Sequence, residues 1–235
     1  MPRQARLRIP GWPLHVIQRG NNRQDCFGEE RDFRVYLLLL DELSSLHGCD
    51  VHAYVLMTNH VHLLLTPRGP YGASPLMKAL GQRFVQYVNR KHARSGRLFE
   101  GRFRSCIVDS DEYLLRCHRY IEMNPVRAGM VAHPSRYKWS SYLANGEGRP
   151  CDFLVPHALY IGLASEAEER RRLYRALFEL PEPPSELREI RQAVNSGKAL
   201  AGESFLANLD EKTRAKATLR CRGRPRIAPP TERSA

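Results

Sequence analysis

The stretch AYVLMTNHVHLLL, residues 53–65, decides the fold that this sequence predicts. It spans parts of two runs rich in apolar and β-branched residues, DVHAYVLM at 50–57 and HVHLLLT at 60–66. Only Thr58 and Asn59 separate the runs, and so short a connection predicts an antiparallel hairpin. His60 and His62 are two positions apart on the second strand, so both side chains should leave the same face of the sheet.

Helices and strands alternate on both sides of this hairpin. LHVIQR at 14–19 predicts a strand, and apolar residues three to four apart predict a helix over 29–47. After the hairpin, the same patterns predict a helix over 74–94, a strand over 104–108 and a helix over 109–123, which Pro125 ends. The order β-α-β-β-α-β-α is typical of an α+β fold in which helices cover a small antiparallel sheet, as in ferredoxin-like and RRM-like domains.

The chain changes character near residue 147. Residues 1–147 hold the predicted sheet domain, and residues 148–211 predict a helical C-terminal region with a charged helix over 166–180. A proline-rich linker follows at 181–184, and a helical segment over 187–209 is interrupted at Gly197. Apolar periodicity is lost from Lys212 onward, so we expect residues 212–235 to form a basic, disordered tail.

The charge of the chain indicates a polyanionic partner. It has 37 Lys and Arg against 25 Asp and Glu, a net charge of +12. Residues 1–145 hold 21 of the basic side chains and 12 of the acidic ones, and 18 of those 21 are arginines. Arginine binds phosphate through two parallel hydrogen bonds, so nucleic acid is the expected partner. The alternative is a basic surface with no function.

The cysteines and the apolar runs predict a reduced, cytoplasmic setting for a nucleoid-associated protein. The six cysteines include no CxxC pair, which argues against a zinc ribbon and a disulfide framework. Residues 1–13 are basic and interrupted by prolines, unlike a secretory signal. The longest apolar run, residues 35–40, is too short to cross a bilayer, so we expect no membrane partner.

Two pairs of residues are candidates for chemistry. His60 and His62 on one strand face could hold a divalent metal, although an isolated His-x-His pair in a strand is often structural. Tyr120 and Asn124 stand one helical turn apart on the helix at 109–123, so the Asn124 amide oxygen could complete the metal shell while Tyr120 points at the same space. The alternative is that Tyr120 is a half-buried core residue and Asn124 simply ends the helix before Pro125.

Two stretches, AYVLMTNHVHLLL at 53–65 and RYIEMNPVRAGMV at 119–131, resemble the HUH (His-hydrophobic-His) single-strand DNA transposases. Within that superfamily the sequence is most similar to the REP-associated tyrosine transposases. The resemblance runs from about Leu14 to Tyr142 and includes QRGNNRQ at 18–24, FEGRFRS at 99–105 and WSSY at 139–142. It departs from the family pattern at Thr58, where many relatives have proline.

The resemblance implies that residues 1–147 form a catalytic domain with the HUH nuclease fold. It implies that His60 and His62 are metal ligands, that Asn124 supplies a third contact, and that Tyr120 is the catalytic nucleophile. The expected cofactor is Mg²⁺ or Mn²⁺, and histidine ligands favour Mn²⁺. The family chemistry would cleave and rejoin single-stranded DNA that forms palindromic hairpins, through a 5′-phosphotyrosine intermediate. The sequence does not identify the base that would activate the phenol.

Basic and aromatic residues interleave at several places that could track a DNA backbone or stack unpaired bases. A basic arm at the N-terminus could enter a groove beside a hairpin stem, and Arg222-Gly223-Arg224-Pro225 is similar to the core of an AT-hook. The candidate DNA-binding residues are Arg3, Arg6, Arg8, Arg19, Arg23, Arg83, Tyr87, Arg90, Arg97, Arg102, Arg104, Arg116, Arg222 and Arg224. For the residues on the helix at 74–94, a solvated helix face is the alternative.

Two other functions remain open from the residues. One is a DNA- or RNA-binding regulator that keeps the fold without turnover, and the other is a metallohydrolase that uses activated water and forms no covalent intermediate. The presence of His60, His62, Tyr120 and Asn124 together favours the tyrosine enzyme. The protein could work as a monomer or a homodimer, and in a dimer Tyr120 could serve the metal site of the partner.

Overall fold

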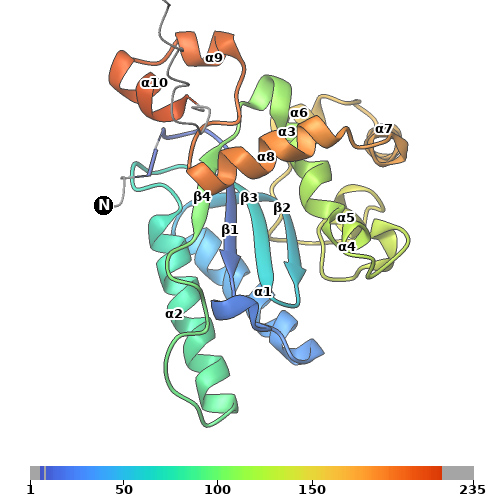
Figure 1. Cartoon of the computed structure of the whole chain (residues 1–235). Coiled ribbons are helices and arrows are strands. Elements are labelled where there is room, and N and C mark those ends of the chain that lie inside the picture. Colours follow the sequence, from blue (N-terminus) through green and yellow to red (C-terminus); the bar gives the residue numbers. More distant parts are fainter. Residues whose placement is uncertain (1–5, 8, 219–235) are drawn as a thin grey trace, which may run out of the picture.

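The sheet predicted from the sequence is present. A computed structural model of the chain describes residues 6, 7 and 9–218, without the side chains of 110–112. The sheet contains β1 (Leu14–Arg19), β2 (Cys49–Met57), β3 (His60–Pro67) and β4 (Arg104–Ile107) in the order β2-β3-β1-β4 (Figure 1). Every pairing is antiparallel, and the order is that of a ferredoxin-like fold, which confirms the predicted α+β class.

The register of the sheet places the paired histidines beside β1. The β2–β3 hairpin turns at Thr58 and Asn59, so that Met57 lies opposite His60. On its other side β3 pairs with β1, where Ile17 lies opposite His62. Side chains alternate between the faces of a sheet, so His60, His62 and the odd-numbered residues of β1 project to one face.

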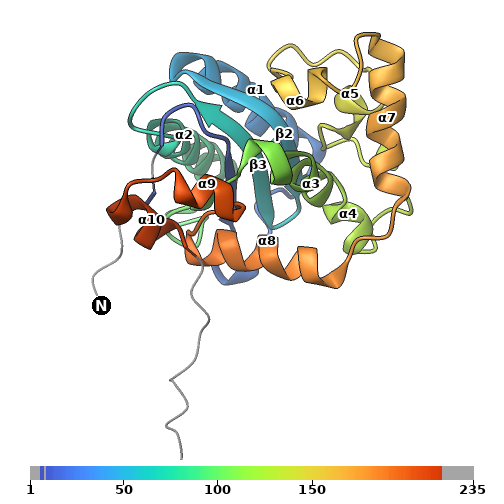
Figure 2. The ribbon, with the colours of Figure 1, turned by 90° about the horizontal axis from the view of Figure 1, so that it is seen from above.

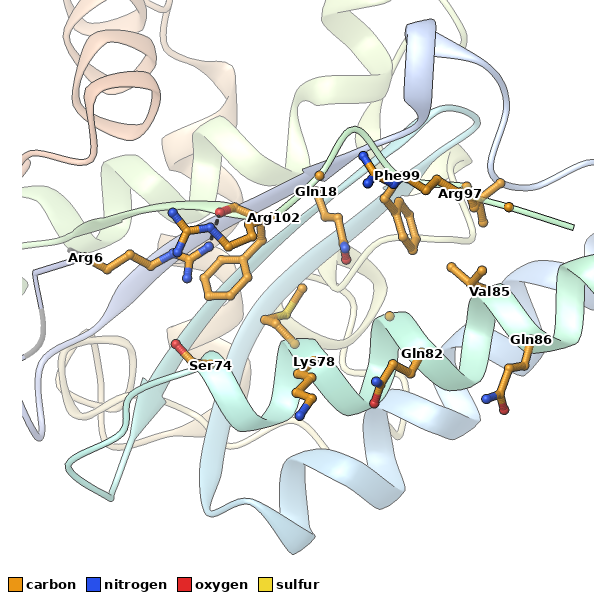
Figure 3. A pocket seen from close by; sticks show the side chains of 16 residues that line it. Arg6, Gln18, Ser74, Lys78, Gln82, Val85, Gln86, Arg97, Phe99 and Arg102 are labelled. Carbon is orange, nitrogen blue, oxygen red and sulfur yellow. Dashed lines mark hydrogen bonds between the residues drawn. The ribbon is translucent and has the colours of Figure 1, made fainter. Parts of the chain in front are cut away.

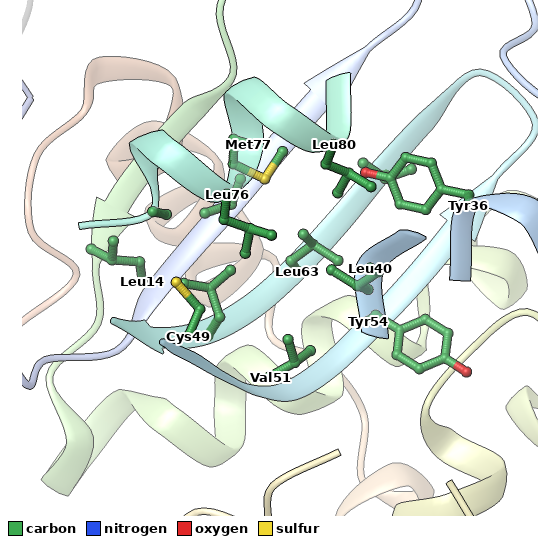
Figure 4. Packing of buried hydrophobic residues seen from close by; sticks show 14 of the residues in the cluster. Leu14, Tyr36, Leu40, Cys49, Val51, Tyr54, Leu63, Leu76, Met77 and Leu80 are labelled. Carbon is green, nitrogen blue, oxygen red and sulfur yellow. The ribbon is translucent and has the colours of Figure 1, made fainter. Parts of the chain in front are cut away.

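Helices α1 (Glu30–Leu46) and α2 (Ser74–Lys91) cover the opposite face of the sheet (Figure 2). A capping box between Glu29 and Asp32 begins α1. Gly48 follows the helix with a φ of +59°, a conformation that favours glycine. Leu40 of α1 and Leu76 and Leu80 of α2 pack with Leu63 of β3 into the first core, and all four are fully buried (Figure 4).

The histidine face is covered by α3 (Ser110–Glu122), by the short α4 (Asn124–Arg127) and by α8 (Pro184–Ser196). Ile190 and Val194 of α8 pack in the same buried cluster as Cys117 of α3 and Leu64 of β3. Gly197 then ends α8 with a φ of +69°, at the predicted break. The C-terminal region therefore completes the second layer of the sheet domain instead of standing apart from it (Figure 2).

A third buried cluster lies beside β2. It joins α5 (Tyr142–Asn145), α6 (Ala158–Ile161) and α7 (Ala167–Glu179) through the aromatic rings of Tyr142, Tyr160, Tyr174 and Phe178. The short helices η1 (Asn21–Arg23) and η2 (Pro134–Arg136) complete the connections. The backbone N–H of Leu56 donates to the carbonyl of Trp139 at 2.9 Å, so the WSSY segment lies along the free edge of β2.

The predicted start of the disordered tail, at residue 212, is too early in the sequence. Helices α9 (Glu203–Ala207) and α10 (Glu211–Ala217) follow α8, and the backbone N–H of Ala199 donates to the carbonyl of Ala217 at 2.9 Å. A capping bond to the Asp210 side chain begins α10, which apolar periodicity alone could not reveal. Residues 219–235 lie outside the described part. Among the described helices, none is both long and apolar enough to cross a membrane.

Candidate active site

A pocket of about 340 Å³ opens on the histidine face, between the sheet, α3 and α8. It is lined by residues of β1, β3 and the loop before β4, and by residues of α3, α4 and α8. His60, His62, Tyr120 and Asn124 all line this pocket. The structure thus brings together the four residues that the sequence predicted to share a site.

The same ring nitrogen is engaged in both histidines. The Nδ1 atom of His60 lies 2.6 Å from the Asn59 Oδ1 atom, and the Nδ1 atom of His62 lies 2.8 Å from the His15 Nε2 atom. These contacts engage Nδ1 and leave Nε2 of each ring, and the two ring centroids are 5.1 Å apart. Metal-binding histidines are commonly oriented in this way, by a hydrogen bond at the nitrogen that does not bind the metal.

Burial keeps these imidazoles neutral at physiological pH. It lowers the pKa of His15 to about 3 and that of His60 to about 4. The pKa of His62 lies well below its ordinary value because the ring is buried and because His15 and His60 are close. A neutral imidazole has a lone pair for a metal, whereas an imidazolium does not.

Tyr120 is buried beside the histidines. The residue is 5% exposed, and its ring meets those of His15 and His62 edge-on at centroid distances of 5.7 and 5.9 Å. Within the described residues, the side-chain hydrogen bonds that reach Tyr120 end on its backbone carbonyl and not on its phenol oxygen. The hydroxyl is therefore available to a ligand. A tyrosine with a purely structural role would not need an available hydroxyl.

Arg127 fixes the other side of the Tyr120 ring. Its guanidinium carbon lies 4.5 Å from the ring centroid, and its Nη2 atom donates to the Tyr120 carbonyl. The Nη1 atom lies 2.8 Å from both carboxylate oxygens of Glu182, in the linker before α8. Both partners of this ion pair are largely buried, which makes the arginine a stable support for the tyrosine.

Asn124 lines the pocket together with the two histidines. Its Nδ2 atom donates to the carbonyls of Tyr120 and Ile121 at 2.9 and 3.1 Å, which ends α3 and leaves the amide oxygen unengaged by these bonds. No group of three or more His, Cys, Asp or Glu side chains in the described residues could hold a metal. Two imidazoles and one amide oxygen still fit a divalent ion that takes its remaining ligands from phosphate and water.

Arginines surround the pocket. The cationic lining residues are Arg19, Arg102, Arg104, Arg127 and Arg191, whereas Glu100 is the acidic one among the described lining residues. The Nη1 atom of Arg104 donates to the Asn195 Oδ1 atom at 2.7 Å, which ties the entrance of β4 to α8. A pocket with this balance of charge favours a phosphodiester.

The candidate DNA-binding residues fall into separate places. Arg19, Arg102 and Arg104 line the Tyr120 pocket, and Arg6 and Arg97 line a second groove on the other face of the sheet. Arg23 and Arg90 are exposed and line neither of these cavities. Arg3, Arg8, Arg222 and Arg224 lie outside the described residues.

Three of the candidates contact the chain itself. Arg83 pairs with Glu42 at 2.5 Å, and Tyr87 donates its hydroxyl to the buried Asp32 carboxylate at 2.9 Å. Arg116 lies 3.8 Å from Glu186. Both Arg83 and Tyr87 contact α1, which favours the alternative of a helix face for these two residues, and their binding to DNA stays a prediction. We leave these three residues out of the proposed DNA surface.

Sequence reasoning missed His15, Arg127, Arg191 and Asn195. His15 lies opposite Leu64, which places it diagonally next to His62 on the same face, and only the strand register reveals this. Arg127 stands in the same segment as Tyr120, RYIEMNPVRAGMV, so the sequence did contain a signal that could have identified it as a site residue. Nothing local in the sequence indicates that α8 reaches the pocket.

Known transposases resemble this chain in sequence or in fold. The family described as "Transposase IS200 like" matches residues 10–124. A solved REP-associated tyrosine transposase, bound to a REP hairpin, is 18% identical with a TM-score of 0.55, over 63% of this chain and 87% of that one. A putative transposase from Deinococcus radiodurans R1 is also 18% identical, with a TM-score of 0.36 over 55% of this chain and 98% of that one. The search of curated proteins gives no match.

Proposed function

Because residues 10–124 place this chain in the IS200-like transposase family, we propose that it cleaves and rejoins single-stranded, hairpin-forming DNA with Tyr120 as the nucleophile. The observation that carries the proposal is the pocket in which Tyr120, His60, His62 and Asn124 meet under a wall of arginines. The likeness in fold to a transposase bound to a REP hairpin supports hairpin DNA as the substrate.

The residues of the pocket have different roles in the proposed reaction. Arg19, Arg102 and Arg104 bind and orient the phosphodiester. The phenol of Tyr120 loses its proton and its oxygen bonds to phosphorus, while the bond from phosphorus to the 3′ oxygen breaks and that oxygen leaves as a 3′-hydroxyl. The products are a 5′-phosphotyrosine and a free 3′ end, and attack by another 3′-hydroxyl reverses the step and joins strands.

A divalent ion, Mg²⁺ or Mn²⁺, would neutralise charge on the scissile phosphate when bound. His60, His62 and Asn124 would hold it, since each offers an unengaged donor atom to the pocket. The ring of Tyr120 stands next to His62 in the same chain, at 5.9 Å between centroids. One copy of the chain therefore suffices for this site, and the proposal requires no tyrosine from a partner.

A covalent trapping experiment tests the proposal. The protein is incubated with end-labelled single-stranded hairpin DNA and Mn²⁺, and the products are separated on a denaturing gel. We expect a labelled protein–DNA adduct that Tyr120→Phe abolishes. Tyr113→Phe is the matched control, because Tyr113 lies on the same helix but outside the pocket, and it should leave the adduct intact.

Two results would contradict the proposal. Cleavage that survives Tyr120→Phe would indicate that activated water is the nucleophile, as in a metallohydrolase. Binding of the hairpin without cleavage, in Mn²⁺ and in Mg²⁺, would indicate a regulator. His60→Ala together with His62→Ala should abolish the adduct without weakening DNA binding more than a few-fold, because the arginines supply most of the contact with phosphate.

A further inference from the structure

A second and larger hollow lies on the opposite face of the sheet from Tyr120. This base groove, as we name it, runs between α2 and the loop of residues 96–103 and has a volume of about 670 Å³ (Figure 3). Gln18 of β1 projects into it, whereas its neighbour Arg19 projects into the Tyr120 pocket, because successive residues of a strand face opposite ways. The catalytic chemistry described above does not use this groove.

Gln18 carries a polar group without a partner. The residue is only 7% exposed, and its buried Oε1 atom has no hydrogen-bond partner in the described residues. Across the groove stands Gly81 of α2, where an added Cβ atom would lie 3.5 Å from the Gln18 Nε2 atom. A buried amide with an unmet acceptor is costly to keep, so a ligand that pairs with it is the economical explanation.

The chemistry around Gln18 suits a nucleobase. Phe99 and Phe103 line the groove, and Figure 3 shows Gln18 and Phe99 pointing toward α2 beside each other. The guanidinium of Arg6 lies 3.6 Å above the Phe103 ring. An amide can pair with the hydrogen-bonding edge of a base, while aromatic rings and arginine planes stack on its faces.

The rim of the base groove is cationic. Arg6, Lys78, Arg97 and Arg102 line it, and no acidic side chain is among its described lining residues. A phosphate backbone could follow such a rim while a base enters the cavity. The charge and the aromatic rings together distinguish this groove from an apolar cleft for a lipid or a hydrophobic peptide.

Arg102 joins the base groove to the Tyr120 pocket. It lines both cavities, whereas Glu100 lines only the Tyr120 pocket of the two. Gly101 between them has a φ of +78°, which lets the chain turn from one cavity to the other. We propose that the base groove holds an unpaired nucleobase of the same DNA strand that is cleaved at Tyr120, with Gln18 as the residue that recognises it. The proposal rests on the function proposed above and adds a site of sequence recognition on the other face of the sheet.

The test measures binding separately from cleavage. The full chain with Tyr120→Phe selects from a pool of DNA hairpins that carry a short run of randomised unpaired nucleotides. A fluorescent copy of the selected hairpin is then compared with copies in which one unpaired base at a time is replaced by an abasic site. We expect one or two positions at which base removal weakens binding roughly 5- to 150-fold, the effect of about 1–3 kcal/mol of lost stacking.

Gln18→Leu connects that position to the groove. It should weaken binding of the intact hairpin, with no further loss on the abasic hairpin, because the two changes remove the same contact. It should also leave the melting temperature of the free protein unchanged or higher, since the variant removes a buried amide oxygen without a partner in the described residues. Gln192→Leu, on the exposed side of α8, is the matched control and should change neither quantity.

A second variant closes the cavity from the other wall. Gly81→Met adds bulk at a helical position with ordinary φ and should abolish the base preference while α2 stays folded. A covalent adduct at Tyr120 with no base-dependent binding would overturn the groove proposal and keep the proposed function. Base-dependent binding lost in Gln18→Leu, but with no adduct in the wild-type chain, would support the groove and overturn the tyrosine chemistry. A chain that binds no hairpin overturns both.

Discussion

Glu122 is a fully buried carboxylate two residues after Tyr120, and its ionisation should contribute to how stability depends on pH. Its Oε1 atom accepts from the Ser141 Oγ atom at 2.5 Å and the Asn145 Nδ2 atom at 3.0 Å, and its Oε2 atom accepts from the Tyr174 hydroxyl at 2.7 Å. These bonds join α3 to the WSSY segment, α5 and α7. Burial nevertheless outweighs them and raises the pKa of Glu122 from 4.5 to about 7.

The sign of the effect follows from proton binding. Between pH 4.5 and 7 the folded chain keeps the proton on Glu122, whereas the unfolded chain releases it, so the contribution of Glu122 to stability falls as pH rises through this window. At about 1.4 kcal/mol per pH unit, this contribution to the free energy of unfolding falls by about 3 kcal/mol. Glu122→Gln keeps the shape and cannot ionise, so relative to wild type it should gain about 3 kcal/mol between pH 4.5 and 8.

The assay is thermal unfolding of the metal-free protein in EDTA at several pH values. For a chain of this size, 3 kcal/mol corresponds to a change in the melting-temperature difference of roughly 6–12 °C. The difference between the two proteins is the quantity to follow, because burial lowers the pKa of His15 and His118 to about 3 and so makes both chains less stable as pH falls below 6.5. The control is Glu179→Gln on the exposed side of α7.

The outcome can contradict this reasoning directly. If the difference in melting temperature between wild type and Glu122→Gln stays constant from pH 4.5 to 8, burial does not raise the pKa of this carboxylate. Its three hydrogen bonds are then enough to stabilise the ionised form. A gain in Glu122→Gln that grows toward low pH would reverse the sign and refute the assignment of the proton to the folded state.

Three further predictions concern the pocket and its supports. His15→Leu removes the partner of the His62 Nδ1 atom and should weaken Mn²⁺ binding roughly 10- to 100-fold in calorimetry, whereas His92→Gln, at an exposed position, should not. Glu182→Gln loosens the hold on Arg127 and should slow adduct formation roughly 10- to 100-fold with hairpin affinity nearly unchanged; an equal loss of affinity would show that Arg127 acts on DNA instead. Ile190→Ala empties a core position and should lower the free energy of unfolding by about 2–5 kcal/mol in urea, and a change below 1 kcal/mol would show that α8 is not part of the core.

The sheet and its helices could be predicted because each has a local signature. The β2–β3 hairpin follows from two apolar runs around Thr58 and Asn59, and the helix ends follow from glycine and proline. The spacing within each pair made a shared site of His60, His62, Tyr120 and Asn124 possible, and the resemblance to the HUH transposases implied it. They could not supply His15, whose contact with His62 depends on the pairing of β1 with β3, across 47 residues of sequence.

Charge and aromatic content alone were a poor guide to the DNA surface. Arg83 and Tyr87 lie in a segment that resembles a nucleic-acid-binding face, yet both are used to attach α2 to α1. Gln18, an uncharged residue in a strand, is the better candidate because it is buried and its Oε1 atom has no partner in the described part of the chain. A side chain's unmet hydrogen-bonding capacity is a property of its surroundings, so no sequence pattern contains it.

For helix α8, the local sequence pattern predicts the buried face but not the surface that this face covers. Ile190, Ala193 and Val194 form its buried stripe, so helical periodicity alone places Arg191 and Asn195 on the flank of that stripe. What the pattern cannot decide is which apolar surface the stripe covers. The stripe packs in the same cluster as Cys117 of α3, and this places the flank of α8 next to Tyr120. Arg191 and Asn195 therefore both line the Tyr120 pocket. A segment beyond residues 10–124 therefore completes the site, and its removal should expose the sheet and the pocket together.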